Sequence, residues 1–196
     1  MSNLTNFIEE YTISDSICDE FLDYYHANKD EQYKVTSPDE SITATYLTVG
    51  PKDYKVFDNF FSDFVKKVDG YVEDYIFSKQ GEQRSFGSWA LVEPFNIQHY
   101  APGQGYGAVH CERQTFDDGP RFLVWMLYLS DTPNAGTKWI HQDHTTECKK
   151  GSLVIWPSDF THLHTGIPSM NDDKYIATGW VNMIPDEAAT NWMNAA

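Results

Sequence analysis

The stretch YAPGQGYGAVHCE, residues 100–112, ends in a histidine and a glutamate that are separated by one residue. On an extended strand, residues two apart point to the same face, so we expect the side chains of His110 and Glu112 to lie side by side. Another histidine, His164, lies far along the chain in the stretch THLHTG at 161–166. Two histidines and one carboxylate on one side of a metal form a facial triad, the signature of non-haem Fe(II) oxygenases. The pattern therefore predicts a metal site.

Ten residues after His164, Lys174 opens the apolar stretch KYIATGW at 174–180. Three further short motifs stand around the two ligand positions: YAPG at 100–103, RFLVWMLYLSD at 121–131 and KGSLVIW at 150–156. Together these motifs resemble the prolyl 4-hydroxylase branch of the 2-oxoglutarate- and Fe(II)-dependent oxygenases, in particular the small stand-alone type of phages and bacteria. The resemblance covers about residues 96–183, and the order and spacing of the motifs are more specific than any single motif.

The second histidine ligand is ambiguous from the local sequence, because His162 and His164 are two apart and would face the same way on a strand. The spacing to Lys174 that the resemblance implies favours His164. His162 would then lie beside the metal site or face the substrate. Glu112 stands where the family usually has aspartate, and its side chain is one methylene longer. The strand that carries it is therefore expected to sit slightly further from the metal.

The resemblance also implies a binding site for 2-oxoglutarate. Lys174 would pair with the distal carboxylate of this cosubstrate; the alternative is a solvated lysine at the start of a strand. Tyr100 would place its hydroxyl against the cosubstrate, or would be a core tyrosine. Thr178, on the same strand face as Lys174, would share the carboxylate or merely pack. The implied cofactors are Fe(II), 2-oxoglutarate and dioxygen, with ascorbate as the reductant.

The reaction that the resemblance implies is hydroxylation of an unactivated carbon, with release of succinate and CO2. A prolyl residue of a peptide or protein is the favoured substrate; other residues, free amino acids and small metabolites stay open. The alternative is a catalytically silent jelly-roll module that binds a metal or a sugar. Lys174 discriminates between the two, because such a module has no need of a lysine at this position. A zinc hydrolase would need a general base beside the metal, and the sequence offers no candidate.

The composition of the chain indicates which classes of partner it can bind. The chain has 196 residues, 29 acidic against 14 basic, and a net charge of −15. This balance argues against binding to a nucleic-acid backbone, which depends on clustered Lys and Arg. The N-terminus has no signal-peptide pattern, and no apolar run is long enough to cross a membrane. Three cysteines without paired spacing favour a reducing compartment. We therefore expect a cytoplasmic protein, in the host cytoplasm if a phage encodes it, without nucleic-acid or membrane partners.

The residue pattern predicts one domain over residues 1–196, mainly β with flanking helices. Helical periodicity supports helices at about 14–28 and 53–77, which together form a helical support. The region at about 86–183 is rich in short strands, and the resemblance implies a double-stranded β-helix, a jelly roll of the cupin type, braced by these helices. The expected strands are 41–49, 89–93, 96–100, 109–112, 121–129, 138–142, 153–156, 162–165 and 175–182. Residues 80–85 are expected to form a polar loop.

Overall fold

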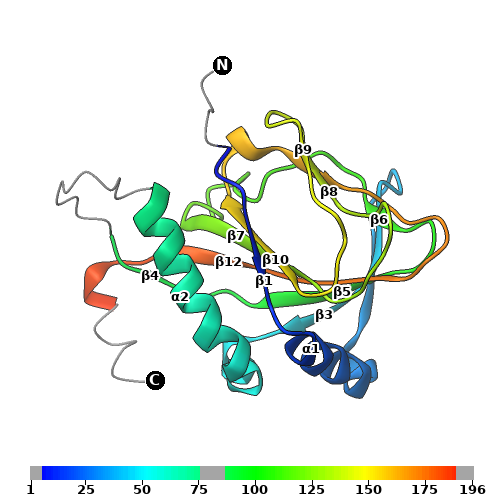
Figure 1. Cartoon of the computed structure of the whole chain (residues 1–196), viewed down its shortest axis with the longest axis horizontal. Coiled ribbons are helices and arrows are strands. Elements are labelled where there is room, and N and C mark those ends of the chain that lie inside the picture. Colours follow the sequence, from blue (N-terminus) through cyan, green and yellow to red (C-terminus); the bar gives the residue numbers. More distant parts are fainter. Residues whose placement is uncertain (1–5, 76–86, 189–196) are drawn as a thin grey trace.

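Twelve strands form two antiparallel sheets within residues 6–75 and 87–188, which are the part of the chain that our computed structural model describes. The large sheet has the order β1-β10-β7-β12-β5-β3-β2, with β4 paired to β12 and β6 to β3. The small sheet has the order β11-β8-β9. The sheets curl around a common interior (Figure 1). This arrangement is the double-stranded β-helix that the family resemblance implies.

The strands of the large sheet are β1 Glu9–Thr12, β2 Tyr33–Thr36, β3 Ile42–Val49, β4 Trp89–Ala90, β5 Phe95–Tyr100, β6 Gly105–Tyr106, β7 Arg121–Tyr128, β10 Ser152–Pro157 and β12 Lys174–Met183. The small sheet contains β8 Thr137–Trp139, β9 His144–Thr145 and β11 His164–Gly166. The helices are α1 Asp15–Ala27 and α2 Asp58–Tyr75, with short 3-10 turns at Lys29–Glu31, Pro51–Phe57 and Phe160–His162.

Alternation along the central strands separates a packed face from a cavity face. On β12, Ala177 and Val181 join the core beneath the helices, whereas Ile176 belongs to the other core, inside the curl. Tyr100 on β5 also points inward, whereas Ile97 on the same strand points to the helices. Because successive side chains of a strand point to opposite faces, each strand both anchors the helices and builds the cavity.

The two α-helices cover the outer face of the large sheet (Figure 1). Their aromatic stripe packs on the sheet, with the ring of Phe60 5.2 Å from that of Trp125 on β7 and Phe21 packed edge-on against Phe60. This confirms the predicted helical support. The second helix, however, begins at Asp58 rather than at 53, because Pro51 opens a 3-10 turn that leads into it. Neither helix combines the length and apolarity that crossing a bilayer requires.

Several strand predictions need correction. Residues 109–112 form no strand; only a single bridge joins His110 to His164. His162 ends a 3-10 turn instead of sharing a strand with His164. The strand expected at 89–93 is reduced to β4, and the one expected at 138–142 is β8, which begins and ends earlier. The loop expected at 80–85 lies outside the described residues.

Candidate metal centre

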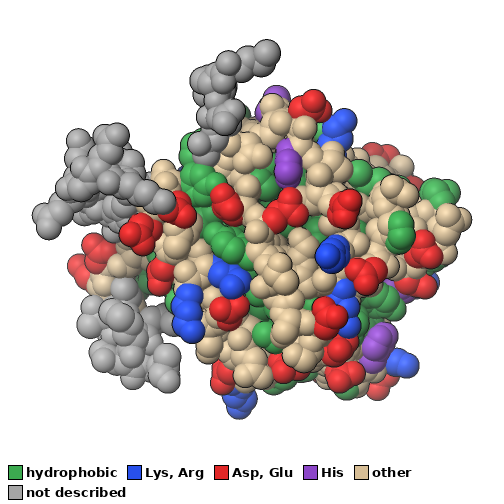
Figure 2. Space-filling model, in the orientation of Figure 1, with side chains coloured by type: hydrophobic (Ala, Val, Ile, Leu, Met, Phe, Trp, Pro, Cys, Tyr) green, Lys and Arg blue, Asp and Glu red, His purple; other side chains and the backbone are tan. Residues whose placement is uncertain are grey.

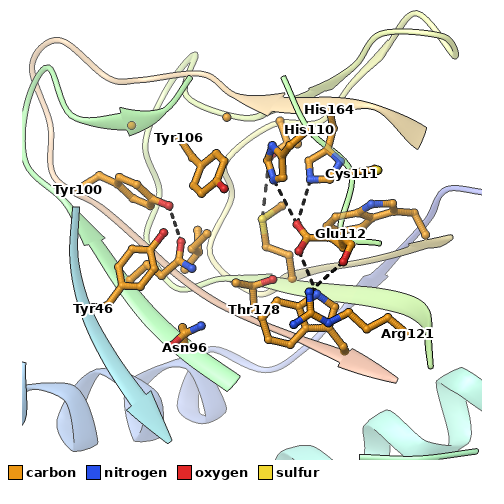
Figure 3. A pocket seen from close by; sticks show the side chains of 18 of the residues that line it. Tyr46, Asn96, Tyr100, Tyr106, His110, Cys111, Glu112, Arg121, His164 and Thr178 are labelled. Carbon is orange, nitrogen blue, oxygen red and sulfur yellow. Dashed lines mark hydrogen bonds and ion pairs between the residues drawn. The ribbon is translucent and has the colours of Figure 1, made fainter. Parts of the chain in front are cut away.

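A cavity of about 300 Å³ lies inside the curl of the strands. Its lining combines the predicted ligands with residues of β5 and β12. Figure 3 shows His110, His164 and Glu112 gathered on one side of this cavity, while Tyr100 and Tyr46 lie on the other. All six side chains that the sequence predicts for the site, those of His110, Glu112, His164, Lys174, Tyr100 and Thr178, line the cavity.

The two imidazoles and the carboxylate converge. Oε1 of Glu112 lies 3.2 Å from Nε2 of His110 and 3.4 Å from Nε2 of His164, and one ligand atom from each residue lies within 4.8 Å of the others. The backbone bridge causes this meeting. The N–H of His110 donates to the carbonyl of His164 at 3.0 Å, and the N–H of His164 donates to the carbonyl of His110 at 2.8 Å.

The outer nitrogens of both imidazoles are fixed by backbone carbonyls. Nδ1 of His110 lies 3.0 Å from the carbonyl of Ala108, and Nδ1 of His164 lies 2.9 Å from that of His162. A carbonyl only accepts hydrogen bonds, so each Nδ1 carries a proton. In the neutral imidazoles, Nε2 then holds a lone pair that points into the site, as in a metal-binding histidine.

This donor set fits a divalent metal. Two Nε2 lone pairs and one carboxylate oxygen are all acceptors, and together they require a cation between them. Burial opposes ionisation of Glu112, but hydrogen bonds from the two histidines and their charge outweigh it and hold the pKa of this carboxyl well below its usual range. A metal ion between the three side chains would take the place of these hydrogen bonds, because carboxylates and imidazoles bind metals in their deprotonated forms.

Lys174 lies inside the cavity, which excludes the solvated alternative. Lys174 is only 5% exposed, and its Nζ donates a hydrogen bond to the carbonyl of Gly136 at 3.4 Å. The ammonium also lies 5.9 Å from the ring centre of Tyr100 and 5.6 Å from that of Tyr128. Among the described residues no carboxylate pairs with it, and burial lowers its pKa to about 8. The cavity therefore contains a cation without a counter-charge.

Tyr100 and Thr178 occupy different parts of the cavity wall. Tyr100 pairs with Lys174 across β5 and β12, is buried, and donates its hydroxyl to Oε1 of Gln98. Burial raises the pKa of Tyr100 well above its usual value, so its hydroxyl stays protonated. Thr178 lies four residues beyond Lys174 on the same strand face, about 13 Å away at the usual rise of a strand. Its hydroxyl donates to the carbonyl of Trp125 at 3.0 Å.

The side chain of His162 points away from the cavity, contrary to expectation. Its Nε2 donates to the carbonyl of Asn6 at 3.0 Å, and the hydroxyl of Thr161 lies 2.9 Å from its Nδ1. Only the backbone carbonyl of His162 reaches the site, through Nδ1 of His164. The 3-10 turn produces this difference, since it breaks the alternation that would have placed both histidines on one face.

Sequence reasoning missed the site roles of Trp180 and Arg121. Both line the cavity, and the indole Nε1 of Trp180 donates to Oε2 of Glu112 at 3.0 Å. Trp180 continues the inward-facing series of Lys174 and Thr178 on β12, so strand alternation could have placed it in the cavity. Nothing in the local sequence, however, indicates that its partner is Glu112.

Part of the sequence that builds this site matches a known protein family. The family model described as "2OG-Fe(II) oxygenase superfamily" matches residues 95–182. A search of curated protein sequences gives no significant match. The region matched by the family model contains all six predicted site residues and extends from the first residue of β5 almost to the end of β12.

Solved structures share the fold at low sequence identity. A viral collagen prolyl hydroxylase from Paramecium bursaria Chlorella virus 1, in complex with 2-oxoglutarate, aligns with a TM-score of 0.70 and 18% identity, covering 91% of this chain and 97% of its own. A prolyl 4-hydroxylase from Pseudomonas putida aligns with a TM-score of 0.67 and 15% identity, covering 92% and 94%. A prolyl hydroxylase from Trichoplax adhaerens, in complex with a hypoxia inducible factor peptide fragment, aligns with a TM-score of 0.62 and 15% identity, covering 96% and 87%.

The fold, the motif order and the family match agree with one another. Residues 95–182 therefore match the 2OG-Fe(II) oxygenase superfamily, and the chain is a dioxygenase that uses Fe(II), 2-oxoglutarate and dioxygen.

Proposed function

We propose that this enzyme hydroxylates a prolyl residue of a peptide or protein, with His110, Glu112 and His164 as the iron ligands and Lys174 as the anchor of 2-oxoglutarate. The observation that carries the proposal is the pairing of two features in one cavity. Three ligand atoms meet within 4.8 Å, and a buried ammonium without a carboxylate partner among the described residues lies in the same cavity.

When bound, Fe(II) and 2-oxoglutarate supply the oxidative chemistry, in which 2-oxoglutarate and dioxygen give succinate, CO2 and one oxygen atom for the substrate. The chain supplies the geometry. His110 and His164 present Nε2 because their Nδ1 protons are held by carbonyls. Glu112 supplies the negative charge. Three ligands on one side leave the remaining coordination positions open for 2-oxoglutarate and dioxygen.

Electrostatics favours Lys174 as the anchor of 2-oxoglutarate. An unpaired ammonium in a dry cavity is unfavourable, and a carboxylate from the cosubstrate relieves that cost. The hydroxyl of Tyr100, on the neighbouring strand, stays protonated and donates to Oε1 of Gln98, so it would have to exchange this partner to donate to the same carboxylate. Thr178 is better suited to the packing role, because its hydroxyl proton is already committed to Trp125.

A peptide substrate is supported by the solved structures of similar fold, all three of which are prolyl hydroxylases, one of them bound to a peptide fragment. Aromatic side chains such as Tyr46, Tyr106 and Trp180 line the cavity and suit an apolar ring such as that of proline. Figure 2 shows acidic side chains spread over the visible face with basic ones between them. Such a surface suits a neutral or basic peptide better than a nucleic acid.

The test is formation of succinate from 2-oxoglutarate by the purified protein with Fe(II) and ascorbate. The wild type should release succinate, and a peptide library should yield products that gain the mass of one oxygen atom, at proline. Glu112→Ala is the matched control. Release of succinate without any modified peptide would move the substrate to small molecules, whereas absence of succinate would favour the silent binding module.

A further inference from the structure

We infer that Trp180 and Arg121 form a clamp that makes Glu112 bind the metal through one oxygen only. The term clamp refers to these two side chains throughout. The inference rests on the proposed function, since the orientation of Glu112 matters only if it is a ligand. It assigns positioning roles to two residues that lie outside the metal triad.

The first observation concerns the backbone of Glu112, which no strand holds. The N–H of Glu112 donates to the carbonyl of Ser158 at 3.1 Å. Nη1 of Arg121 donates to the carbonyl of Glu112 at 2.8 Å. Both backbone groups of Glu112 are therefore fixed, one of them by a side chain from β7. The clamp thus contributes part of what a β-ladder would otherwise supply.

The second observation is that the two carboxylate oxygens of Glu112 have different partners. Oε1 faces the two histidines at 3.2 and 3.4 Å. Oε2 accepts a hydrogen bond from the indole Nε1 of Trp180 at 3.0 Å. An indole N–H only donates, so it competes with a metal for the lone pairs of Oε2. Oε1 is left as the oxygen that faces the ligand nitrogens.

This difference has a chemical consequence. Carboxylates bind metals through one or both oxygens, and the extra methylene of Glu112 gives it more freedom to turn than an aspartate has. Coordination through both oxygens would use a position that the cosubstrate or dioxygen needs. By holding Oε2, Trp180 keeps that position free. The clamp therefore compensates for the presence of glutamate where the family usually has aspartate.

The third observation is that Trp180 is itself fixed. The guanidinium of Arg121 lies 3.9 Å from the centre of its ring. Arg121 is in turn held by Glu93, whose Oε2 lies 3.0 Å from Nε and 2.7 Å from Nη2, and by Oδ1 of Asp118 at 2.9 Å from Nη1. A planar guanidinium can stack on a ring and bind a carboxylate at the same time, which an ammonium cannot. Figure 3 shows Arg121 directly beside Glu112.

The test is anaerobic titration with Co(II), followed by calorimetry and by the visible absorption spectrum of the bound metal. Trp180→Phe keeps an aromatic ring over Arg121 and removes the N–H. We expect its Co(II) affinity to fall about 10- to 100-fold, as is usual when a partner of a ligand is removed. The spectrum should also change, because the coordination of Glu112 changes. Unchanged affinity and spectrum would overturn the clamp.

A double-mutant cycle with Glu112→Asp separates the hydrogen bond from packing. The shorter carboxylate cannot reach the metal and the indole together, so Trp180→Phe should change Co(II) affinity less than about threefold in the Glu112→Asp background. An equal loss in both backgrounds would mean that Trp180 acts through packing alone and would overturn the inference.

Trp125→Phe is the matched control. Trp125 is also buried and does not line the cavity, and its ring packs against Phe60 and Phe95 in the core beneath the helices. This variant should lose stability but keep the wild-type Co(II) spectrum. The two proposals fail differently. If the wild type binds no Co(II), the proposed function fails; if it binds one ion, which Glu112→Ala loses and Trp180→Phe retains unchanged, only the clamp fails.

Discussion

The two halves of the site are held in different ways. Lys174 and Tyr100 come from neighbouring strands and are direct partners in the β12–β5 ladder, so backbone hydrogen bonds set their positions. His110 and Glu112 come from a segment without a strand, where one bridge and a set of side-chain hydrogen bonds hold them. We call Lys174 and Tyr100 the cosubstrate half of the site, and His110 and Glu112 with their surroundings the metal half. The cosubstrate half should keep its shape when side chains change, whereas the shape of the metal half should depend on individual side chains.

The largest effect is expected at Glu112 in the metal half. Glu112→Ala removes the charged ligand and leaves two histidines, so turnover of 2-oxoglutarate should fall at least about 1,000-fold. Succinate formation under saturating Fe(II) measures this loss. Glu112→Asp should retain part of the activity. Turnover by Glu112→Ala at the wild-type rate would remove Glu112 from the site.

The next effect tests the cosubstrate half. Lys174→Met removes the buried ammonium, so 2-oxoglutarate should bind about 100-fold more weakly. The cofactor-free chain should become more stable, by on the order of 2 kcal/mol, because the unpaired charge no longer has to be buried. Calorimetry and denaturant unfolding measure the two quantities. Lys138→Met, at an exposed position of β8, should change neither. A loss of stability in Lys174→Met would contradict the comparison.

A smaller effect is expected when Arg121 is replaced by lysine. The ammonium keeps the charge but cannot stack on Trp180 and bind Glu93 and the carbonyl of Glu112 together. Metal affinity should fall about tenfold, while 2-oxoglutarate affinity at saturating metal should hardly change. Metal titration of Arg121→Lys measures this loss, and Arg113→Lys is the control. Arg113 is exposed, and its Nη1 lies 3.2 Å from Oδ1 of Asp159. Equal behaviour of the two variants would show that the metal half needs no such support.

The smallest effect is a pH dependence in the cosubstrate half. The groups that face Lys174 are Tyr100, Tyr128 and Cys148, and burial raises the pKa of all three, so they stay neutral near pH 8. With the pKa of Lys174 lowered to about 8, the ammonium loses its proton as pH rises past that value. The Kd for 2-oxoglutarate should therefore rise roughly fourfold between pH 7 and 8.5. Lys174→Met should show no such rise.

The lowered pKa of Lys174 also makes the free energy of unfolding depend on pH. The pKa of Lys174 is lower in the folded chain than its ordinary value of 10.5, so the unfolded chain binds more protons between these values. The free energy of unfolding of the cofactor-free chain should therefore increase as pH rises from about 8 toward 10.5, relative to Lys174→Met. Denaturant unfolding at several pH values measures the difference, and the opposite slope would contradict the assigned shift.

The sequence predicted the strand-held half well, and the physical reason is periodicity. Alternation along β12 places Lys174 and Thr178 on one face, and the aromatic stripe of 58–75 identifies the helix behind the sheet. The prediction failed where side chains from distant positions replace a regular ladder. Residues 109–112 alternate like a strand, but Arg121 and Ser158 hold Glu112 instead.

Other failures have a similar cause. Strand β1 is short and half-exposed, and it exists because β10 offers an open edge that local sequence does not reveal. The 3-10 turn before His164 directs the buried side chain of His162 away from the cavity, and a pattern of two histidines two apart contains no sign of this turn. The roles of Trp180 and Arg121 depend on partners distant in the sequence, so only the folded arrangement identifies them.

The central claim is that three side chains from a loop and a strand hold one Fe(II) ion, with Lys174 placed to receive 2-oxoglutarate beside it. The most direct test is an anaerobic titration of the protein with Fe(II) and 2-oxoglutarate, followed by the visible charge-transfer absorption of the iron–cosubstrate complex. We predict one Fe(II) per chain, a band that appears only when 2-oxoglutarate is added, and no band in Glu112→Ala. Absence of the band in the wild type, or its full intensity in Glu112→Ala, would contradict this account.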